Sequence, residues 1–258
     1  MNAVEVGPLG VLASLTLVVL AMLLSWREQL GLSRSIVWAA LRAIAQMAVI
    51  GAALGLVLAD DAPLVLSWAW VVAMVVVGAV TVSSRSKGVA GVFAVTLLAL
   101  GLAEAVSLGV VFGLGIFPLE ARTLVPAAGM LMGNTIAATV LAVRRTVAEI
   151  DEHGAQIEVR LALGQPGRSA VRPHLAEAMR TAITPQIEQT KIVGLIALPG
   201  TMTGLLLAGV APVDAVLTQT VVMFLILGSV AVTAVVVGRG IARRLVTADH
   251  RLVTPSRA

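Results

Sequence analysis

The sequence predicts an all-α integral membrane protein of about seven transmembrane helices, with its N-terminus outside and its C-terminus in the cytoplasm. Of its 258 residues, 59% are hydrophobic and only 12% charged, which is more apolar surface than one soluble core can bury. Apolar runs long enough to cross about 30 Å of hydrocarbon recur along the chain. Because these runs lack the alternating pattern of a membrane barrel, helices are the expected spanning elements.

The first apolar run is expected to stay in the mature protein as an anchor. No basic stretch precedes it, and its positive charge, Arg27, follows it, which is the reverse of a signal peptide. The predicted spans cover residues 7–25, 35–58, 64–82, 89–114, 122–143, 192–210 and 215–238.

Positive charge alternates between the connections and predicts the orientation. Lys and Arg gather in the first, third and fifth connections and in the tail, whereas Asp60, Asp61, Glu120 and Asp214 lie in the others. Basic connections stay in the cytoplasm, so the alternation favours seven crossings. Since the basic residues lie between apolar runs rather than along one stripe, nucleic acid is not an expected partner.

The long connection from 144 to 190 is expected to form a helical elbow on the cytoplasmic side. Ile157 and Leu161 lie four apart on one helical face, and Gly164 followed by Pro166 is typical of a helix C-terminus.

A second elbow helix is predicted from an N-cap at Ser169 to about Thr184, ended by Pro185. No repeat or low-complexity linker is evident, so residues 1–258 are interpreted as one transmembrane domain. Small-residue pairs that permit close helix approach, either within one bundle or in a dimer, are Gly51 with Gly55, Gly109 with Gly113, Gly129 with Gly133, and Gly200 with Gly204.

Motifs for enzymatic chemistry are missing from the sequence. Neither lysine, Lys87 or Lys191, belongs to a phosphate-binding loop, and no metalloprotease or nucleophile-elbow motif occurs. The chain has no cysteine, and all three histidines fall in predicted cytoplasmic segments. No catalytic, cofactor-binding or metal-ligating residue is therefore assigned, and any ATP would be bound by a partner.

Polar residues inside the predicted spans are candidates for a transport path. Glu104 lies mid-span, where a carboxylate costs about 2.5–3.5 kcal/mol on insertion scales, so it suggests cation contact or proton coupling unless it is protonated or paired between helices. Arg42 and Gln46 share one face of the second span, although Arg42 could also extend to the interface.

The later spans add further path candidates. Asn134 either bonds between helices or lines a path. Pro199 and Gly200 interrupt the sixth span and suggest a hinge or path at membrane depth. Thioethers that could bind soft metals, or simply fill space, are those of Met130, Met132, Met202 and Met223.

Five segments, in order over nearly the whole chain, resemble the FetB-type ABC transporter permeases, a family of proposed iron exporters with plant aluminium-tolerance relatives. The LPGTMTG and AGMLMGN blocks are the most specific. The segments are RAIAQ at 42–46, AGMLMGN at 128–134, EVRLALG at 158–164, GLIALPGTMTG at 194–204 and QTVVMF at 219–224.

The resemblance implies a multi-pass permease of the cell (inner or plasma) membrane that pairs with a separate ABC ATPase, as two permeases and two ATPases. EVRLALG also resembles the cytoplasmic loop by which ABC permeases contact their ATPases, with Glu158 and Gly164 at the expected spacing. We therefore expect Ile157, Glu158, Leu161 and Gly164 to couple the chain to the ATPase, with Ile157 and Leu161 filling a pocket of that subunit. The implied function is ATP-driven export of iron, another metal or a small solute.

Two alternatives remain open at the level of sequence. A proton-coupled secondary transporter would use Glu104 and need no ATPase. A membrane anchor or sensor would bind a signalling partner and carry no flux.

Overall fold

Every element with regular structure in the described part of the chain is a helix. The computed structural model describes residues 8–59, 62–86, 91–195, 198–246 and 251–253. The helices are α1 (Pro8–Arg27), α2 (Ser33–Val57), α3 (Leu64–Arg85), α4 (Val92–Gly113), α5 (Ala121–Glu152), α6 (Gly154–Ala162), α7 (Gly167–Ile192), α8 (Gly200–Leu207) and α9 (Pro212–Leu245). The all-helical prediction is confirmed.

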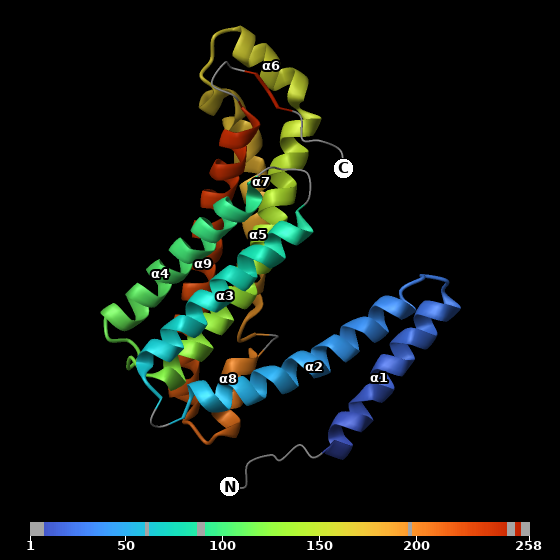
Figure 1. Ribbon diagram of the computed structural model, residues 1–258, viewed down its shortest axis with the longest axis vertical. Helices are drawn as coiled ribbons and strands as arrows, with labels where there is room; N and C mark the ends of the chain where they lie inside the picture. Colours follow the sequence, from blue (N-terminus) through green and yellow to red (C-terminus); the bar gives the residue numbers. More distant parts are fainter. Residues whose placement is uncertain (1–7, 60–61, 87–90, 196–197, 247–250, 254–258) are drawn as a thin grey trace.

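Helices α5 and α9 form the centre of the bundle. They pack against each other, and α3, α4 and α7 pack around them (Figure 1). At about 1.5 Å per residue, the 32 residues of α5 and the 34 of α9 extend well beyond about 30 Å of hydrocarbon. The ends of α5, α7 and α9 therefore project past α3 and α4, and α6 lies across this projection (Figure 1).

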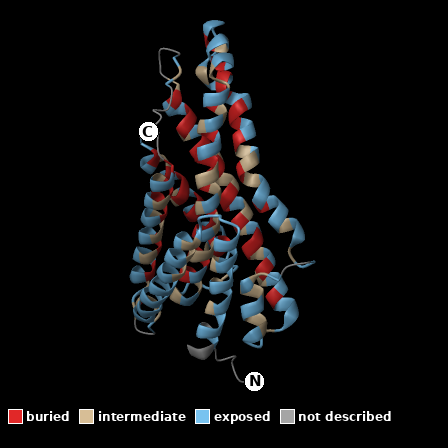
Figure 2. Cartoon of the chain, turned by 90° about the vertical axis from the view of Figure 1, so that its right-hand side faces the viewer, coloured by how far each residue is buried: buried red, intermediate tan, exposed pale blue. Residues whose placement is uncertain are grey.

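Two apolar clusters hold the bundle together. The cluster nearer α6 joins α3, α4, α5, α6, α7 and α9 around Leu100, Ile150 and Ile241. The other cluster joins α3, α4, α5 and α9 around Leu124 and Val230. Buried residues accordingly follow the inward faces of these helices, and exposed apolar residues cover their outer faces, as expected for a surface in contact with lipid (Figure 2).

Helices α1 and α2 form a hairpin that extends away from the bundle (Figure 1). They pack on each other, and α2 meets α3 at only a few residues. Large apolar side chains along α2 are exposed, among them Trp38, Leu41 and Met47.

Five helices, α2 to α5 and α9, are long and apolar enough to cross a membrane, and α1 is apolar over a shorter stretch, Leu12–Arg27. The predicted span at 192–210 is not one helix. Here α7 ends at Ile192 and α8 begins only at Gly200 after Pro199 in an extended conformation, so the interruption expected at Pro199 and Gly200 is confirmed.

The prediction for the second elbow helix was wrong at both ends. Helix α7 begins at Gly167, so Ser169 lies inside it, and the helix continues through Pro173 and Pro185 to Ile192. Proline removes one backbone donor but did not stop this helix, because packing on α5 and α9 supports α7 along its length.

The glycines at which helices pack closely are not those of the small-residue pairs. At all eight glycines of those pairs, an added Cβ would have no neighbour within 4 Å among the described residues, so packing between the described helices does not explain them. At Gly240 of α9, by contrast, an added Cβ would lie 2.4 Å from Cγ1 of Val95 in α4. Gly238 similarly faces Leu175 of α7 at 3.0 Å.

Polar contacts complete the bundle. The hydroxyl groups of Ser107 and Ser229, both buried, lie 2.6 Å apart and join α4 to α9. The guanidinium of Arg144 in α5 donates from Nε and Nη2 to the carbonyl oxygen of Arg85, at 3.2 and 2.9 Å. This carbonyl ends α3 and has no partner in its own helix, so Arg144 caps α3 and fixes its end against α5.

Candidate functional site

A cavity of about 290 Å³ lies inside the bundle where α8 folds back beside α5, α7 and α9. Its walls come from four helices and from the chain that joins α7 to α8. The lining residues are Met130, Asn134, Gln186, Gln189, Ile192, Val193, Pro199, Gly200, Thr201, Gln219, Val222, Met223 and Ile226.

Helix α5 supplies Met130 and Asn134, which lie four residues apart and so share one helical face. The amide nitrogen of Asn134 donates to the carbonyl oxygen of Met130 at 2.8 Å. This bond stays within α5. Of the two alternatives for Asn134, an interhelical bond is not among the bonds described, whereas the residue does line the cavity.

Helix α9 supplies Gln219, Val222 and Met223, which share a face by the same spacing. Gln219 is only 3% exposed, and its amide oxygen has no hydrogen-bond partner among the described residues. Leaving a buried amide oxygen unbonded costs about 1–3 kcal/mol. At the cavity wall, this oxygen can accept a hydrogen bond from a molecule inside the cavity. It can also coordinate a cation there.

The end of α7 supplies Gln186 and Gln189 immediately after Pro185. Because proline has no N–H, the carbonyl oxygen of Thr181 loses its helical partner, and α7 is weakened just before it reaches the cavity. Across the cavity, the hydroxyl group of Thr201 at the start of α8 lies 3.1 Å from the sulfur of Met130. This contact holds the short helix α8 against α5.

The wall of the cavity is largely apolar, and its polar groups carry no charge. No Asp, Glu, Lys or Arg is among the described lining residues; amides, one hydroxyl group and two thioethers supply the polar atoms. Amide groups both donate and accept hydrogen bonds, and thioethers bind soft metals. A neutral wall attracts a cation weakly, which suits a site that must also release what it binds.

The cavity gathers some of the residues predicted from sequence and leaves others apart. Asn134, Pro199 and Gly200 line it, whereas Met202 is half-buried in α8 and is not part of the lining. Arg42 and Gln46 are exposed on α2, outside the bundle. They are not brought to the cavity.

Glu104 also lies away from the cavity. It is 3% exposed within α4, and its Oε1 has no hydrogen-bond partner among the described residues. Ser107, one turn further along α4, contacts Ser229 of α9 through its buried hydroxyl group. A buried carboxyl group without an ion-pair partner among the described residues fits the predicted cost of Glu104, and its function stays a prediction.

The four residues expected to couple the chain to the ATPase also divide into two groups, two buried and two not. Ile157 is fully buried and Leu161 is 7% exposed, and both pack into the chain's own apolar cluster. The expectation that they fill a pocket of an ATPase is therefore wrong, because this chain already covers them. Glu158 is exposed, and Gly164 has φ of +83°, which confirms the expected left-handed turn.

The exposed face of α6 carries apolar residues that the sequence interpretation missed. Val159 is 60% exposed and Leu163 is 77% exposed. Their spacing of four places them on one face, a signal that was available in the sequence but was masked by the equally spaced pair Ile157 and Leu161. Gln186 and Gln189 were missed because they lie in a polar stretch, TPQIEQTK at 184–191, that is typical of an exposed helix, and Gln219 was quoted only as part of QTVVMF.

The fold is that of a multi-pass membrane protein: five of its described helices are long and apolar enough to cross a membrane, and the cavity lies among helices of this bundle. The chain belongs to the family described as "Uncharacterised protein family (UPF0014)", whose model matches residues 8–246.

Curated relatives cover most of the chain. "UPF0014 membrane protein YjkA" of Bacillus subtilis is 34% identical over 85% of this chain and 87% of its own length. "Probable iron export permease protein FetB" of Escherichia coli is 30% identical over 98% of this chain and 97% of its own length. "Protein ALUMINUM SENSITIVE 3" of Arabidopsis thaliana is 29% identical over 86% and 81%, respectively. These names confirm the family resemblance, and no solved structure matches the chain.

Proposed function

We propose that this chain is the membrane-spanning permease subunit of an ATP-driven ABC transporter that exports iron, another metal or a small solute, with ATP bound by a separate ATPase subunit. The observation that carries the proposal is the cavity. Three of the five segments that resemble the FetB-type permeases, at 128–134, 194–204 and 219–224, are far apart in sequence and meet at its wall. The similarity to a protein named as a probable iron export permease supports the same function.

The proposed topology has seven crossings, with the N-terminus outside. Helices α1 to α5 make five crossings, α9 makes the last, and the end of α7 together with α8 makes the sixth as a broken span. The start of α1 and the end of α9 lie at opposite ends of the long axis, as an odd number of crossings requires (Figure 1). Arg144, Arg243 and Arg244 at the α6 end support a cytoplasmic location for that end.

The ATPase is proposed to dock on the exposed face of α6. This surface, which we call the α6 outer face, consists of Glu158, Val159 and Leu163. Ile157 and Leu161 contribute by holding α6 to the bundle, so that a force applied to the outer face moves α7 rather than α6 alone.

Helix α7 is the proposed lever. It begins close to α6 at Gly167 and reaches the cavity at Gln186 and Gln189, so one element contacts both the docking region and the path. Its 26 residues span roughly 39 Å at 1.5 Å per residue. ATP-driven closure of the ATPases would tilt α7, and Pro185 is the place where the cavity end can bend relative to the rest.

A homodimer is proposed as the working permease. The small-residue pairs have no neighbour among the described residues of this chain, and the apolar side chains of α2 are exposed, so both surfaces remain for lipid or for a second copy. Each permease would carry its own ATPase.

The experiment is reconstitution into liposomes of the purified chain, alone and with a candidate ABC ATPase subunit, with Fe²⁺ as the first cargo tested. The proposal predicts flux only with ATPase and ATP. Glu104, a buried carboxyl group with an unpaired oxygen, favours the alternative of a proton-coupled carrier. That alternative predicts flux by the chain alone in a proton gradient, abolished in the Glu104→Gln variant.

A further inference from the structure

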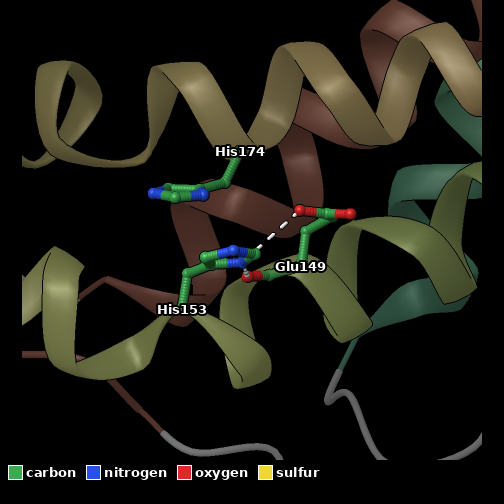
Figure 3. Close-up of side chains that lie close together, drawn as sticks. All are labelled: Glu149, His153 and His174. Carbon is green, nitrogen blue, oxygen red and sulfur yellow. Dashed lines mark hydrogen bonds and ion pairs between the residues drawn. The ribbon is translucent and has the colours of Figure 1, made fainter.

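Three side chains with metal-binding groups meet at the cytoplasmic projection, away from the cavity. Glu149 lies in the last turn of α5, His153 follows directly where α5 joins α6, and His174 lies in α7 (Figure 3). Each residue offers one ligand atom, and these atoms all lie within 4.8 Å of one another. Two imidazoles and one carboxylate are thus brought together from positions up to 25 residues apart.

The two imidazole rings lie face to face. Their centroids are 4.4 Å apart with 26° between the ring planes, and Nδ1 of His153 lies 3.5 Å from Oε2 of Glu149. In Figure 3 the ring of His174 lies over that of His153, with the Glu149 carboxylate beside them.

The hydrogen bond of His153 indicates which of its ring nitrogens carries the proton. Nδ1 lies 3.0 Å from the carbonyl oxygen of Glu149. A carbonyl oxygen can only accept, so Nδ1 carries the proton and Nε2 keeps its lone pair. Metal-binding histidines commonly show this arrangement, in which one ring nitrogen donates to a carbonyl and the other binds the metal.

His174 has a polar atom that packing alone does not explain. The residue is only 9% exposed, and its Nε2 has no hydrogen-bond partner among the described residues. A neutral imidazole is the form that binds metals.

We propose that Glu149, His153 and His174 bind a divalent transition-metal ion, with a fourth position open to water. Two imidazoles and a carboxylate are a donor set that both Zn²⁺ and Fe²⁺ accept. Bonds of about 2.1 Å in a tetrahedral site place ligand atoms about 3.4 Å apart. The ligand atoms are within 4.8 Å of one another, so the His153 ring, which is 30% exposed, and the Glu149 carboxylate must rotate to reach this spacing.

The ion would join three helices at one point. His153 is the residue between α5 and α6, so a bond from it to His174 fixes the start of α6 against α7. Because α6 and α7 are the docking and lever elements of the proposed transport cycle, the site is placed to adjust coupling. Binding itself does not depend on which cargo crosses the membrane.

The test is Zn²⁺ titration by calorimetry of the full chain, purified in detergent with a tag that contains no histidine and treated with a chelator first. We expect one tight Zn²⁺ per chain. Replacing any one ligand, in Glu149→Gln, His153→Gln or His174→Gln, should weaken binding by at least about 100-fold, since even the loss of outer-shell groups costs 10–100-fold. The matched control is Glu177→Gln, an exposed carboxylate of α7 paired with Arg180, which should bind like the wild type.

A second readout separates binding from folding. Zn²⁺ should raise the thermal midpoint of the wild type and of Glu177→Gln but not of the ligand variants. Of these variants, His153→Gln is the decisive one, because its side chain is 30% exposed and tolerates replacement by a polar residue. Unchanged Zn²⁺ affinity in folded His153→Gln, or no tight Zn²⁺ in the wild type, would overturn the proposal.

Discussion

The two faces of α6 make opposite predictions, and a pair of variants separates them. Ile157 is fully buried against the chain's own core, whereas Leu163 is 77% exposed on the α6 outer face. We predict that Ile157→Ala lowers the stability of the permease, while Leu163→Ala leaves stability unchanged and weakens ATPase association.

The magnitudes follow from the burial of each side chain. Removing the methyl groups of a fully buried Ile costs about 2–5 kcal/mol, because a cavity remains. Replacing Leu163 by Ala deletes three carbon groups worth about 0.8 kcal/mol each when buried at an interface. Since 77% of this residue is exposed before docking, the loss is at most about 1.8 kcal/mol, or roughly 20-fold in affinity.

The assay measures two quantities on each variant: the thermal midpoint in detergent, and the affinity for the purified ATPase subunit. Leu163→Ala should have the wild-type midpoint and an affinity about 10- to 20-fold weaker. The reasoning is refuted if Leu163→Ala binds the ATPase normally, or if Ile157→Ala keeps the wild-type midpoint and loses binding instead.

Two further predictions concern packing and the cavity. Gly240→Ala should destabilise the bundle by about 1–3 kcal/mol because the new Cβ meets Val95 at 2.4 Å. The control Gly101→Ala, whose nearest atom lies at 3.8 Å, should be neutral or stabilising. Thermal unfolding in detergent measures both, and equal midpoints would contradict this packing. Gln219→Leu should keep or raise stability, because it removes an unpaired buried amide oxygen, yet lower cargo-stimulated ATP hydrolysis severely. Thr220→Val, on the exposed face of the same helix, should affect neither property, and normal stimulation in Gln219→Leu would exclude the cavity as the path.

The sequence was sufficient for the helices that cross the membrane as single runs. For α3 and α4, an apolar stretch of the right length and its flanking glycine, proline or charge determine the element locally, and the boundaries agree within a few residues. Local signals were insufficient at Pro185 and Ser169. Serine is a common N-cap and proline a common helix terminator. The contacts of α7 with α5 and α9, which involve residues far away in sequence, override both signals.

Part of the candidate site was predictable, because some of its residues stand out locally in the sequence while their contacts depend on residues far away. A residue such as Asn134 or Pro199 is unusual inside an apolar run, and so the sequence singles it out. Which of these residues meet depends on how α8 folds back against α5. Glu104 is absent from the cavity because α4, the helix that carries it, supplies none of the lining residues. Glu149 and His153 share a helical face by their spacing of four, but their link to His174 requires the pairing of α5 with α7.

The absence of cysteine from the sequence permits the most direct test of the cavity as an alternating path, because an introduced thiol is the only one in the chain. Gln189→Cys and Asn134→Cys each place one thiol at the cavity wall. In liposomes that contain the permease and its ATPase, a membrane-impermeant maleimide should label Gln189→Cys from the cytoplasmic side without nucleotide. ATP with vanadate should suppress that labelling and expose Asn134→Cys to the reagent from the opposite side. Labelling of both variants that stays the same with and without nucleotide would contradict the account.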